Sequence, residues 1–289
     1  MASLRTHICS LLCYTTFLSL ISCYNLPENH VALFIFGDSL FDAGNNNYIN
    51  TTVNYQANFW PYGETFFKYP TGRFSDGRLI PDFIAEYAGL PLIPPYLQPG
   101  NNKFMDGVNF ASAGAGALVE THQGFEIYKK GGRKFGFLSL GPLGCIPGMK
   151  LLVARNTSSC LEKVTTLAHL HNKALSIALQ KLENQLEGFK FANHNFYTSS
   201  SERINNPSKY GFKVGNMACC GSGPYRGQSS CGGKRQIKEY QLCEKASEYM
   251  FFDSGHPTER ANRQFAELLW HGTPKMTWPY NLKALFNFL

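Results

Sequence analysis

The sequence predicts an α/β fold in which a largely parallel sheet is flanked by helices. Short apolar runs alternate with amphipathic stretches along the chain, as expected for strands followed by covering helices. Apolar residues make up 44% of the 289 residues and charged residues 16%, which supplies a buried core and argues against disorder. No internal repeat or low-complexity linker divides the chain, so we expect one large domain.

Three apolar runs are the strand candidates, because each is short enough for a buried strand and is followed by turn residues or by a helical pattern. They are Val31–Phe36, Lys134–Leu140 and Phe189–Tyr197. If the strands are parallel, their carboxyl ends gather at one edge of the sheet.

Two amphipathic helices follow from the spacing of apolar residues. Between residues 164 and 186, Leu, Val and Ala recur every three or four positions, and Gly188 ends the pattern. A second helix is predicted over Thr258–Leu269, where Thr258 is placed to cap the first turn.

The first 23 residues have the pattern of a secretory signal peptide. Arg5 and His7 precede a mostly apolar stretch, Ile8–Ile21, which is too short to span a bilayer. A buried N-terminal helix is the alternative, but the segment from Tyr24 to Pro27 ends the stretch abruptly. We therefore expect residues 1–23 to be removed and residues 24–289 to form one exported domain without a stable membrane anchor.

The cysteines fit an oxidising compartment. Six remain after residue 23, an even number that favours structural disulfides, although fifteen pairings are possible. A zinc site is the alternative, but the chain contains neither paired CxxC motifs nor HExxH, so we expect no metal and no cofactor. Asn50 and Asn156 begin N-glycosylation sequons, which have meaning in an exported protein.

The net charge of +7 does not indicate a nucleic-acid partner. Part of this charge lies in the segment 129–134, KKGGRK, which has no interleaved aromatic residues and no recognition motif. An acidic polysaccharide or anionic lipid could be attracted weakly to such a surface. We interpret the segment as a solvated helix end and loop.

Ser39 follows the first strand candidate directly, in the stretch FGDSLFDAG. A side chain in such a turn lies at the carboxyl edge of the sheet, where open α/β folds place their chemistry. The alternative for a serine after a strand is to cap the next helix.

Asp253 and His256 are the possible helpers of this serine. A D-x-x-H spacing in a loop allows the carboxylate to fold back onto the imidazole, which leaves the other ring nitrogen free as a base. Such a pair also occurs by chance, with the Asp at a helix start and the His on the surface. Together with Ser39 the pair favours a nucleophile, base and carboxylate, although the G-x-S-x-G motif of other serine hydrolases is absent from the sequence.

Six segments together resemble the plant GDSL esterase/lipases, a branch of the SGNH hydrolases. They are FIFGDSLFDAGNNNYI, GRFSDGRLIPDFIAE, GVNFASAGAGAL, GGRKFGFLSLGPLGCIPG, KYGFKVGNMACCGSGP and DSGHPTERANRQFAE. The resemblance runs from about residue 31 to the end of the chain. It implies an extracellular, flavodoxin-like α/β/α sandwich that hydrolyses acyl or lipid esters through an acyl-enzyme.

The same resemblance implies roles for four residues. Ser39 corresponds to the nucleophile and its backbone N–H to one oxyanion donor, and Gly114 supplies a second donor. His256 corresponds to the general base and Asp253 to its carboxylate partner. Each role is chemically reasonable, because acyl transfer needs an activated hydroxyl, a base and donors aimed at the developing negative charge.

One block of the family is missing from this chain. The family's third oxyanion donor is an Asn in a G-x-N-D block after a central strand, and no such block occurs here. The segments that flank the missing block in the family are joined near Gly124 and Phe125 in this chain. We therefore expect a shortened form of the enzyme that lacks a central strand, with reduced activity, and a secreted form that binds without turnover is the alternative.

The aromatic residues at 60–69 have two interpretations. Trp60, Phe66, Phe67 and Tyr69 could line an acyl pocket, but an aromatic cluster more often belongs to a core, and we expect a core cluster here.

Overall fold

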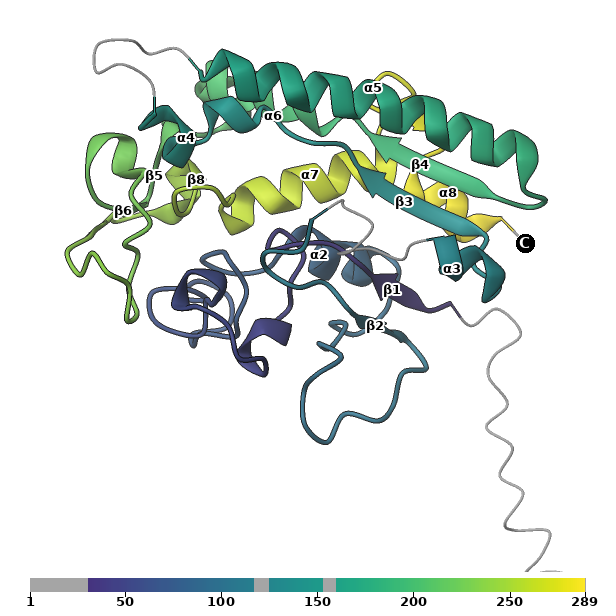
Figure 1. Ribbon diagram of the computed structural model, residues 1–289, viewed down its shortest axis with the longest axis horizontal. Coiled ribbons are helices and arrows are strands. Elements are labelled where there is room, and N and C mark those ends of the chain that lie inside the picture. The colour runs from purple at the N-terminus through teal and green to yellow at the C-terminus, as the bar shows by residue number, and fades with distance from the viewer. Residues whose placement is uncertain (1–30, 117–124, 153–159, 289) are drawn as a thin grey trace, which may run out of the picture. The chain divides into compact units, whose positions relative to one another are not determined.

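The computed structural model describes residues 31–116, 125–152 and 160–288 (Figure 1). All the elements below belong to one compact unit, Ala32–Leu289. The strands are β1 (Leu33–Ile35), β2 (Gly107–Asn109), β3 (Lys134–Leu138), β4 (Lys190–His194), β5 (Val214–Ala218), β6 (Cys220–Gly221), β7 (Gln241–Leu242), β8 (Tyr249–Phe251) and β9 (Thr277–Pro279).

Most helices lie between strands along the chain, and α8 follows the last strand. The α-helices are α2 (Ile80–Tyr87), α3 (Phe125–Lys129), α4 (Pro147–Lys150), α5 (Glu162–Gln185), α6 (Phe196–Asn205), α7 (Glu259–His271) and α8 (Leu282–Asn287). Short 3₁₀ helices are η1 (Asn45–Asn47), η2 (Val53–Tyr55), η4 (Leu143–Cys145), η5 (Pro207–Tyr210), η6 (Pro224–Arg226) and η7 (Ala246–Glu248).

The strands form separate pieces of sheet. β1 pairs with β2, β3 with β4, and β5 with β8, all in parallel, whereas β9 joins β4 and β7 joins β6 in antiparallel fashion. The α/β class with parallel pairing is therefore confirmed. Among the described residues, no strand pairs with β1 on the side away from β2, or with β3 on the side away from β4.

The sheet piece β3–β4–β9 has helices on both faces. Phe135 and Phe137 of β3 pack in a cluster with Leu179 of α5, while Leu138 packs in the cluster formed by α7 and α8. Successive side chains of a strand point to opposite faces, so each helical layer covers its own set. Figure 1 shows α5 running alongside β3 and β4.

The sheet piece β1–β2 is covered on one face. Ile35 of β1 packs against Ala85 of α2, and α2 in turn packs against α7, so this helical layer joins the two pieces of sheet. Phe34 and Phe36 point to the other face and are 52% and 39% exposed. A large apolar side chain exposed on a sheet face marks a surface that other structure normally covers.

The predicted helices and strands are found, but each of the three strands is shorter than predicted. α5 and α7 occur where the periodicity predicts them, and the Thr258 side chain accepts a hydrogen bond from the Ala261 N–H at 3.4 Å. The third predicted strand extends too far, because Asn195 ends it by capping α6 through the Thr198 N–H. Capping by a polar side chain overrides the apolar character of Phe196 and Tyr197.

The predicted disulfides are confirmed, and their pairing is now defined. Cys145 bonds Cys160, Cys219 bonds Cys243, and Cys220 bonds Cys231. None of the described helices is both long and apolar enough to cross a membrane. The predicted signal peptide, the junction at Gly124 and the sequon at Asn156 lie outside the described residues.

Candidate active site

Ser39 lies in a tight turn directly after β1. The Asp38 side chain accepts a hydrogen bond from the Leu40 N–H at 2.9 Å, and the Asp38 carbonyl accepts one from the Phe41 N–H at 3.1 Å. No α-helix follows this turn, so the interpretation of Ser39 as a helix cap is wrong. The Ser39 hydroxyl oxygen instead lies 2.8 Å from Nε2 of His256.

The loop after β8 folds the Asp253 carboxylate back onto His256. Oδ1 of Asp253 accepts hydrogen bonds from the backbone N–H groups of Gly255 and His256, at 3.0 and 2.9 Å. Nδ1 of His256 lies 2.7 Å from the same oxygen. If this nitrogen carries the proton, Nε2 is left to accept a proton from Ser39.

Two further buried residues extend this line, and the sequence analysis missed both. The Tyr62 hydroxyl donates to Oδ2 of Asp253 at 2.6 Å, and Nη2 of Arg235 donates to the Tyr62 oxygen at 3.1 Å. Tyr62 and Arg235 are 0% and 2% exposed. No spacing rule links residues 62, 235 and 253, because the fold alone brings them together.

These neighbours set the charge of Asp253. Burial alone would raise the pKa of its carboxyl, but the charge and hydrogen bond of His256, the charge of Arg235 and the Tyr62 hydrogen bond hold this pKa well below its usual range. Burial raises the pKa of the Tyr62 phenol well above its ordinary value. Asp253 is therefore an anion and Tyr62 a neutral donor throughout the physiological pH range.

Gly114 lies in the segment after β2. This segment is hydrogen-bonded to the turn that contains Ser39. The Ser112 N–H donates to the Gly37 carbonyl at 3.0 Å, and the Ala113 N–H donates to Asp42 at 3.1 Å. Gly114 has a φ of +91°, a conformation that favours glycine. Within the described part of the chain, the backbone N–H groups of Ser39 and Gly114 donate no hydrogen bond.

Asn45 and Asn46 serve as structural clamps. Nδ2 of Asn45 donates to the carbonyls of Asn109 and Ala111, both at 2.8 Å, and Nδ2 of Asn46 donates to Ala113 at 2.9 Å. Both amides are occupied in holding the Gly114 segment against the Ser39 turn. They are therefore not available as oxyanion donors.

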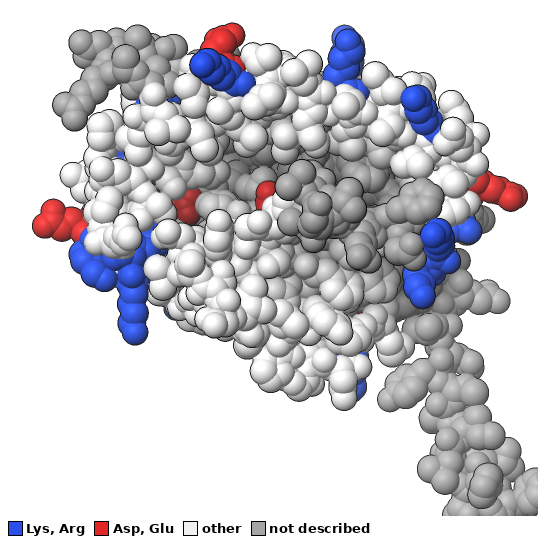
Figure 2. Space-filling model, viewed as in Figure 1, with Lys and Arg blue, Asp and Glu red and all other residues white. Residues whose placement is uncertain are grey.

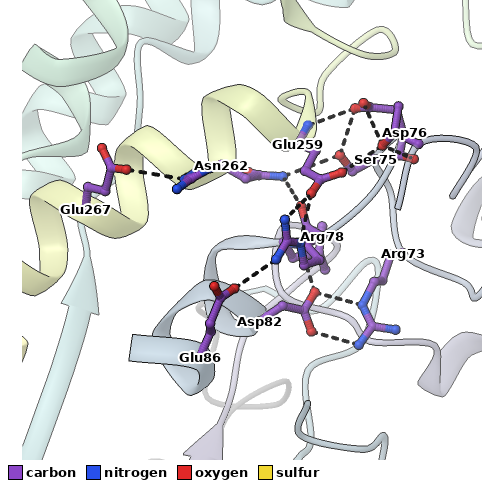
Figure 3. A network of polar contacts seen from close by, with 12 residues as sticks. Arg73, Ser75, Asp76, Arg78, Asp82, Glu86, Glu259, Asn262 and Glu267 are labelled. Atoms are coloured by element: carbon purple, nitrogen blue, oxygen red, sulfur yellow. Dashed lines mark hydrogen bonds and ion pairs between the residues drawn. The ribbon is translucent and has the colours of Figure 1, made fainter. Parts of the chain in front are cut away.

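A polar network fixes the start of α7, and with it the His256 loop (Figure 3). Asp76 accepts a hydrogen bond from the Glu259 N–H at 2.8 Å, and Arg78 forms ion pairs with Glu259 and Glu86. Arg73 makes a two-pronged ion pair with Asp82, with both N–O distances 2.8 Å. Planar pairing of this kind restricts geometry as well as charge.

The aromatic residues at 60–69 do not form the expected core cluster. Trp60, Phe66 and Tyr69 are each about half exposed, so the core interpretation is wrong for them. Arg78 lies over the Phe66 ring, with 4.1 Å between its guanidinium carbon and the ring centre. Within the residues that the structure describes, no group of three or more His, Cys, Asp or Glu side chains could hold a metal ion.

Comparison with known proteins identifies the family of the chain. The family model of GDSL-like lipases and acylhydrolases matches residues 33–129 and 117–269. The chain belongs to this family. It is therefore a hydrolase of the class that acts on ester bonds.

Curated plant relatives cover most of the chain. GDSL esterase/lipase 2 of Arabidopsis thaliana is 45% identical over 343 residues, covering 91% of both proteins. GDSL lipase of Tanacetum cinerariifolium is 46% identical over 341 residues, covering 92% of both. Both alignments extend over more positions than the 289 residues of this chain, so each relative contains residues that have no counterpart here.

Proposed function

We propose that this chain is an exported serine hydrolase that cleaves acyl esters through an acyl-enzyme, with Ser39 as nucleophile, His256 as base and Asp253 as the carboxylate that orients His256. The observation that carries the proposal is the unbroken hydrogen-bonded line from Ser39 through His256 to Asp253, with distances of 2.8 and 2.7 Å. This order of groups is the one that activates a serine hydroxyl.

The chemistry follows from that line. The Ser39 oxygen attacks the ester carbonyl carbon while its proton passes to Nε2 of His256, and Asp253 stabilises the imidazolium. The N–H groups of Ser39 and Gly114 bind the negative oxygen, because they have no other acceptor among the described residues. His256 then protonates the leaving alcohol, and a water molecule activated by His256 hydrolyses the acyl-enzyme.

We propose further that the chain is a shortened form of the family enzyme, without the Asn donor of a G-x-N-D block. The two matches to the family model overlap at residues 117–129, a segment that lies between β2 and β3 in the sequence. Among the described residues, the piece of sheet β1–β2 is not paired with the piece that contains β3. Loss of one oxyanion donor lowers turnover by about 100- to 1,000-fold. We therefore expect slow hydrolysis.

Replacement of Ser39 tests the catalytic proposal. Purified protein should release nitrophenol slowly from p-nitrophenyl acetate, and Ser39→Ala should reduce the rate to that of buffer. Ser201→Ala on α6 is the matched control, because Ser201 is not part of the hydrogen-bonded line, and it should retain the wild-type rate. If the folded Ser39→Ala protein hydrolysed the ester at the wild-type rate, the proposal would be contradicted.

Sequencing of the transcript across the codons for residues 115–135 tests the shortened form. We expect a longer, related transcript whose extra in-frame segment encodes G-x-N-D. Uniform support for the short junction would contradict the view that a longer form exists.

Export rests on the N-terminal segment and the disulfides. The three disulfides fit an oxidising compartment, and Asn50 is exposed, as a glycosylated residue must be. Expression in plant cells should give an extracellular protein that begins near residue 24, as measured by mass spectrometry of its N-terminal peptide. Retention of an uncleaved chain inside the cell would overturn this part of the proposal.

The interrupted sheet favours one alternative, a secreted form that binds its ligand without turnover. It predicts saturable ester binding by the wild-type protein together with a hydrolysis rate equal to that of Ser39→Ala. Measurable turnover that depends on Ser39 would exclude it.

A further inference from the structure

A polar cavity lies outside the candidate active site. It has a volume of about 420 Å³, and its wall is formed by α5, the first turn of α6, the end of β4 and the segment that leads into β9. We call it the α5 cavity. Its volume falls within the range of small-molecule sites, about 300–1,000 Å³. Neither Ser39 nor His256 nor Asp253 is part of its wall, so the cavity needs an explanation other than the proposed ester hydrolysis.

An amide and an aromatic ring lie side by side in this wall. Asn193 of β4 is paired directly with Trp278 of β9 in the antiparallel ladder, so their side chains are neighbours on one face of the sheet. This is the face that α5 covers, because Phe191, two residues before Asn193, packs with Leu179 of α5. Trp278 contacts the Phe191 ring edge-on and is still 40% exposed. Part of the indole is therefore open to a ligand.

Two asparagines of the wall differ in how their amides are used. Oδ1 and Nδ2 of Asn172 bond the N–H and the C=O of Leu140, both at 2.8 Å, which fixes α5 to the end of β3. Nδ2 of Asn193 donates to the Ser176 hydroxyl at 3.3 Å, but its Oδ1 is buried and has no hydrogen-bond partner among the described residues. Buried acceptors are normally paired, so Asn193 favours a ligand that brings a hydroxyl group.

The charged side chains of the wall are all basic. Lys173 of α5 and Lys275 before β9 belong to the wall, and no Asp or Glu is among its described residues. Neither lysine forms an ion pair within the described part of the chain. Figure 2 shows basic side chains that project along the upper edge of the molecule, which α5 forms in Figure 1. Two lysines without a counter-charge favour a negatively charged ligand.

We propose that the α5 cavity binds an acidic sugar, a hexuronate, whose carboxylate pairs with Lys173 and Lys275. A ring hydroxyl bonds Asn193, and the C–H groups of the sugar ring pack against the open face of Trp278. The three features of the wall thus match the three features of a hexuronate. The proposal does not depend on the proposed esterase function, because the cavity contains none of its reacting groups.

Two rival ligands match the wall less completely. Inorganic phosphate pairs with the lysines but has no apolar face for Trp278. A hydrocarbon chain packs on Trp278 but leaves Asn193 and the two lysines without partners, and burying such groups unpaired is costly. Both rivals are therefore included in the test as competitors.

Calorimetric titration of the purified protein, in a buffer without phosphate, compares the ligands. Glucuronate should bind at one site, and glucose, which has the same ring without the carboxylate, should bind about tenfold more weakly. Inorganic phosphate and octanoate should also bind more weakly than glucuronate. Absence of glucuronate binding, equal affinity for glucuronate and glucose, or tighter binding of phosphate or octanoate would each overturn the proposal.

Replacement of the lysines places the carboxylate. Lys173→Gln and Lys275→Gln should each weaken glucuronate binding about two- to fivefold, the range for an exposed ion pair, and should leave glucose binding unchanged. Lys181→Gln is the matched control, because Lys181 lies on α5 outside the cavity wall. All three side chains are exposed, so these variants should fold, as circular dichroism can confirm. Equal effects of Lys173→Gln and Lys181→Gln would contradict the site.

Replacement of the tryptophan places the sugar ring. Trp278→Leu should weaken glucuronate and glucose by the same factor, about two- to tenfold, because the ring face is common to both sugars. Trp60→Leu is the control, since Trp60 is about half exposed but lies outside the wall. Unchanged affinities in a folded Trp278→Leu protein would overturn the assignment of the α5 cavity to a sugar.

Discussion

The two sides of Ser39 differ in how completely they are built. On the polar side, which comprises Asp253, Tyr62, Arg235 and the network of Figure 3, the buried carboxylates of Asp253, Asp76 and Asp82 accept hydrogen bonds at 2.6 to 2.8 Å. On the open side, which comprises β1 and β3, the rings of Phe34 and Phe36 are exposed and, among the described residues, β1 and β3 belong to separate pieces of sheet. The hydrogen bonds that join Ser39, His256 and Asp253 lie next to the polar side.

The difference follows from which parts of the chain build each side. The polar side is assembled from residues 62–86 and 235–259, and the loop carrying Arg235 is tied by the disulfides Cys220–Cys231 and Cys219–Cys243. The open side is built from β1 and β3, and β3 is the first strand after the predicted junction near residue 124. Neither strand contributes a residue to the hydrogen bonds around Asp253.

Breaking the polar side should have the largest effect. Arg73→Met leaves the buried Asp82 carboxylate without its ion pair, at a cost of about 3–5 kcal/mol in the free energy of unfolding. Urea denaturation followed by circular dichroism measures it. Arg263→Met, which breaks an exposed ion pair with Glu267, should change the free energy of unfolding by less than about 1 kcal/mol. Similar losses of unfolding free energy in the two variants would show that the buried ion pair of Arg73 contributes no more than an exposed one.

Removal of one hydroxyl tests whether the polar side supports catalysis. Tyr62→Phe takes away the donor to Asp253, and a hydrogen bond to a charged group contributes about 1.5–3 kcal/mol, so kcat should fall about 10- to 100-fold. KM should be unchanged, because Tyr62 is fully buried and cannot touch a substrate. Steady-state kinetics with p-nitrophenyl acetate measures both constants. Tyr69→Phe is the exposed control, and a fall in kcat of equal size there would refute the role of Tyr62.

The sequence could predict the local parts of this site. The D-x-x-H spacing predicts that Asp253 folds onto His256, because a three-residue separation limits the geometry of the loop. The apolar periodicity predicts α5 and α7, because helix faces follow from residue spacing alone. Both inferences concern residues that are close together in the chain.

The remaining parts could not be predicted from local patterns. Tyr62 and Arg235 reach Asp253 from distant loops, and their burial depends on the whole fold. The exposure of Trp60 and Tyr69 likewise depends on what packs over them.

A change of pH tests how tightly the second piece of sheet is packed. His194 of β4 is fully buried between Thr277 and Ser199, and burial lowers its pKa to about 4 from 6.5. Between pH 6.5 and 4 this histidine is protonated in the unfolded chain but neutral in the folded protein. The contribution of neutral His194 to the free energy of unfolding is therefore complete above pH 6.5 and is lost as the pH falls.

Between pH 7 and 5, wild type should lose about 2 kcal/mol more unfolding free energy than His194→Gln, as measured by urea denaturation at each pH. Burial raises the pKa of Asp76 to about 6, which acts in the opposite direction, but Asp76 is common to both proteins and cancels in the comparison. Equal losses in the two proteins would show that His194 is not held neutral by burial.

The smallest effect is expected on the open side. Phe34 on β1 is about half exposed, so Phe34→Thr removes little buried surface, and Thr keeps the strand preference of a β-branched residue. The free energy of unfolding should change by less than about 0.5 kcal/mol. Phe83→Ala on α2 is the buried counterpart and should cost about 3–5 kcal/mol, because it leaves a cavity in the core. A large loss of unfolding free energy for Phe34→Thr in urea denaturation would mean that this face of β1 is covered in solution.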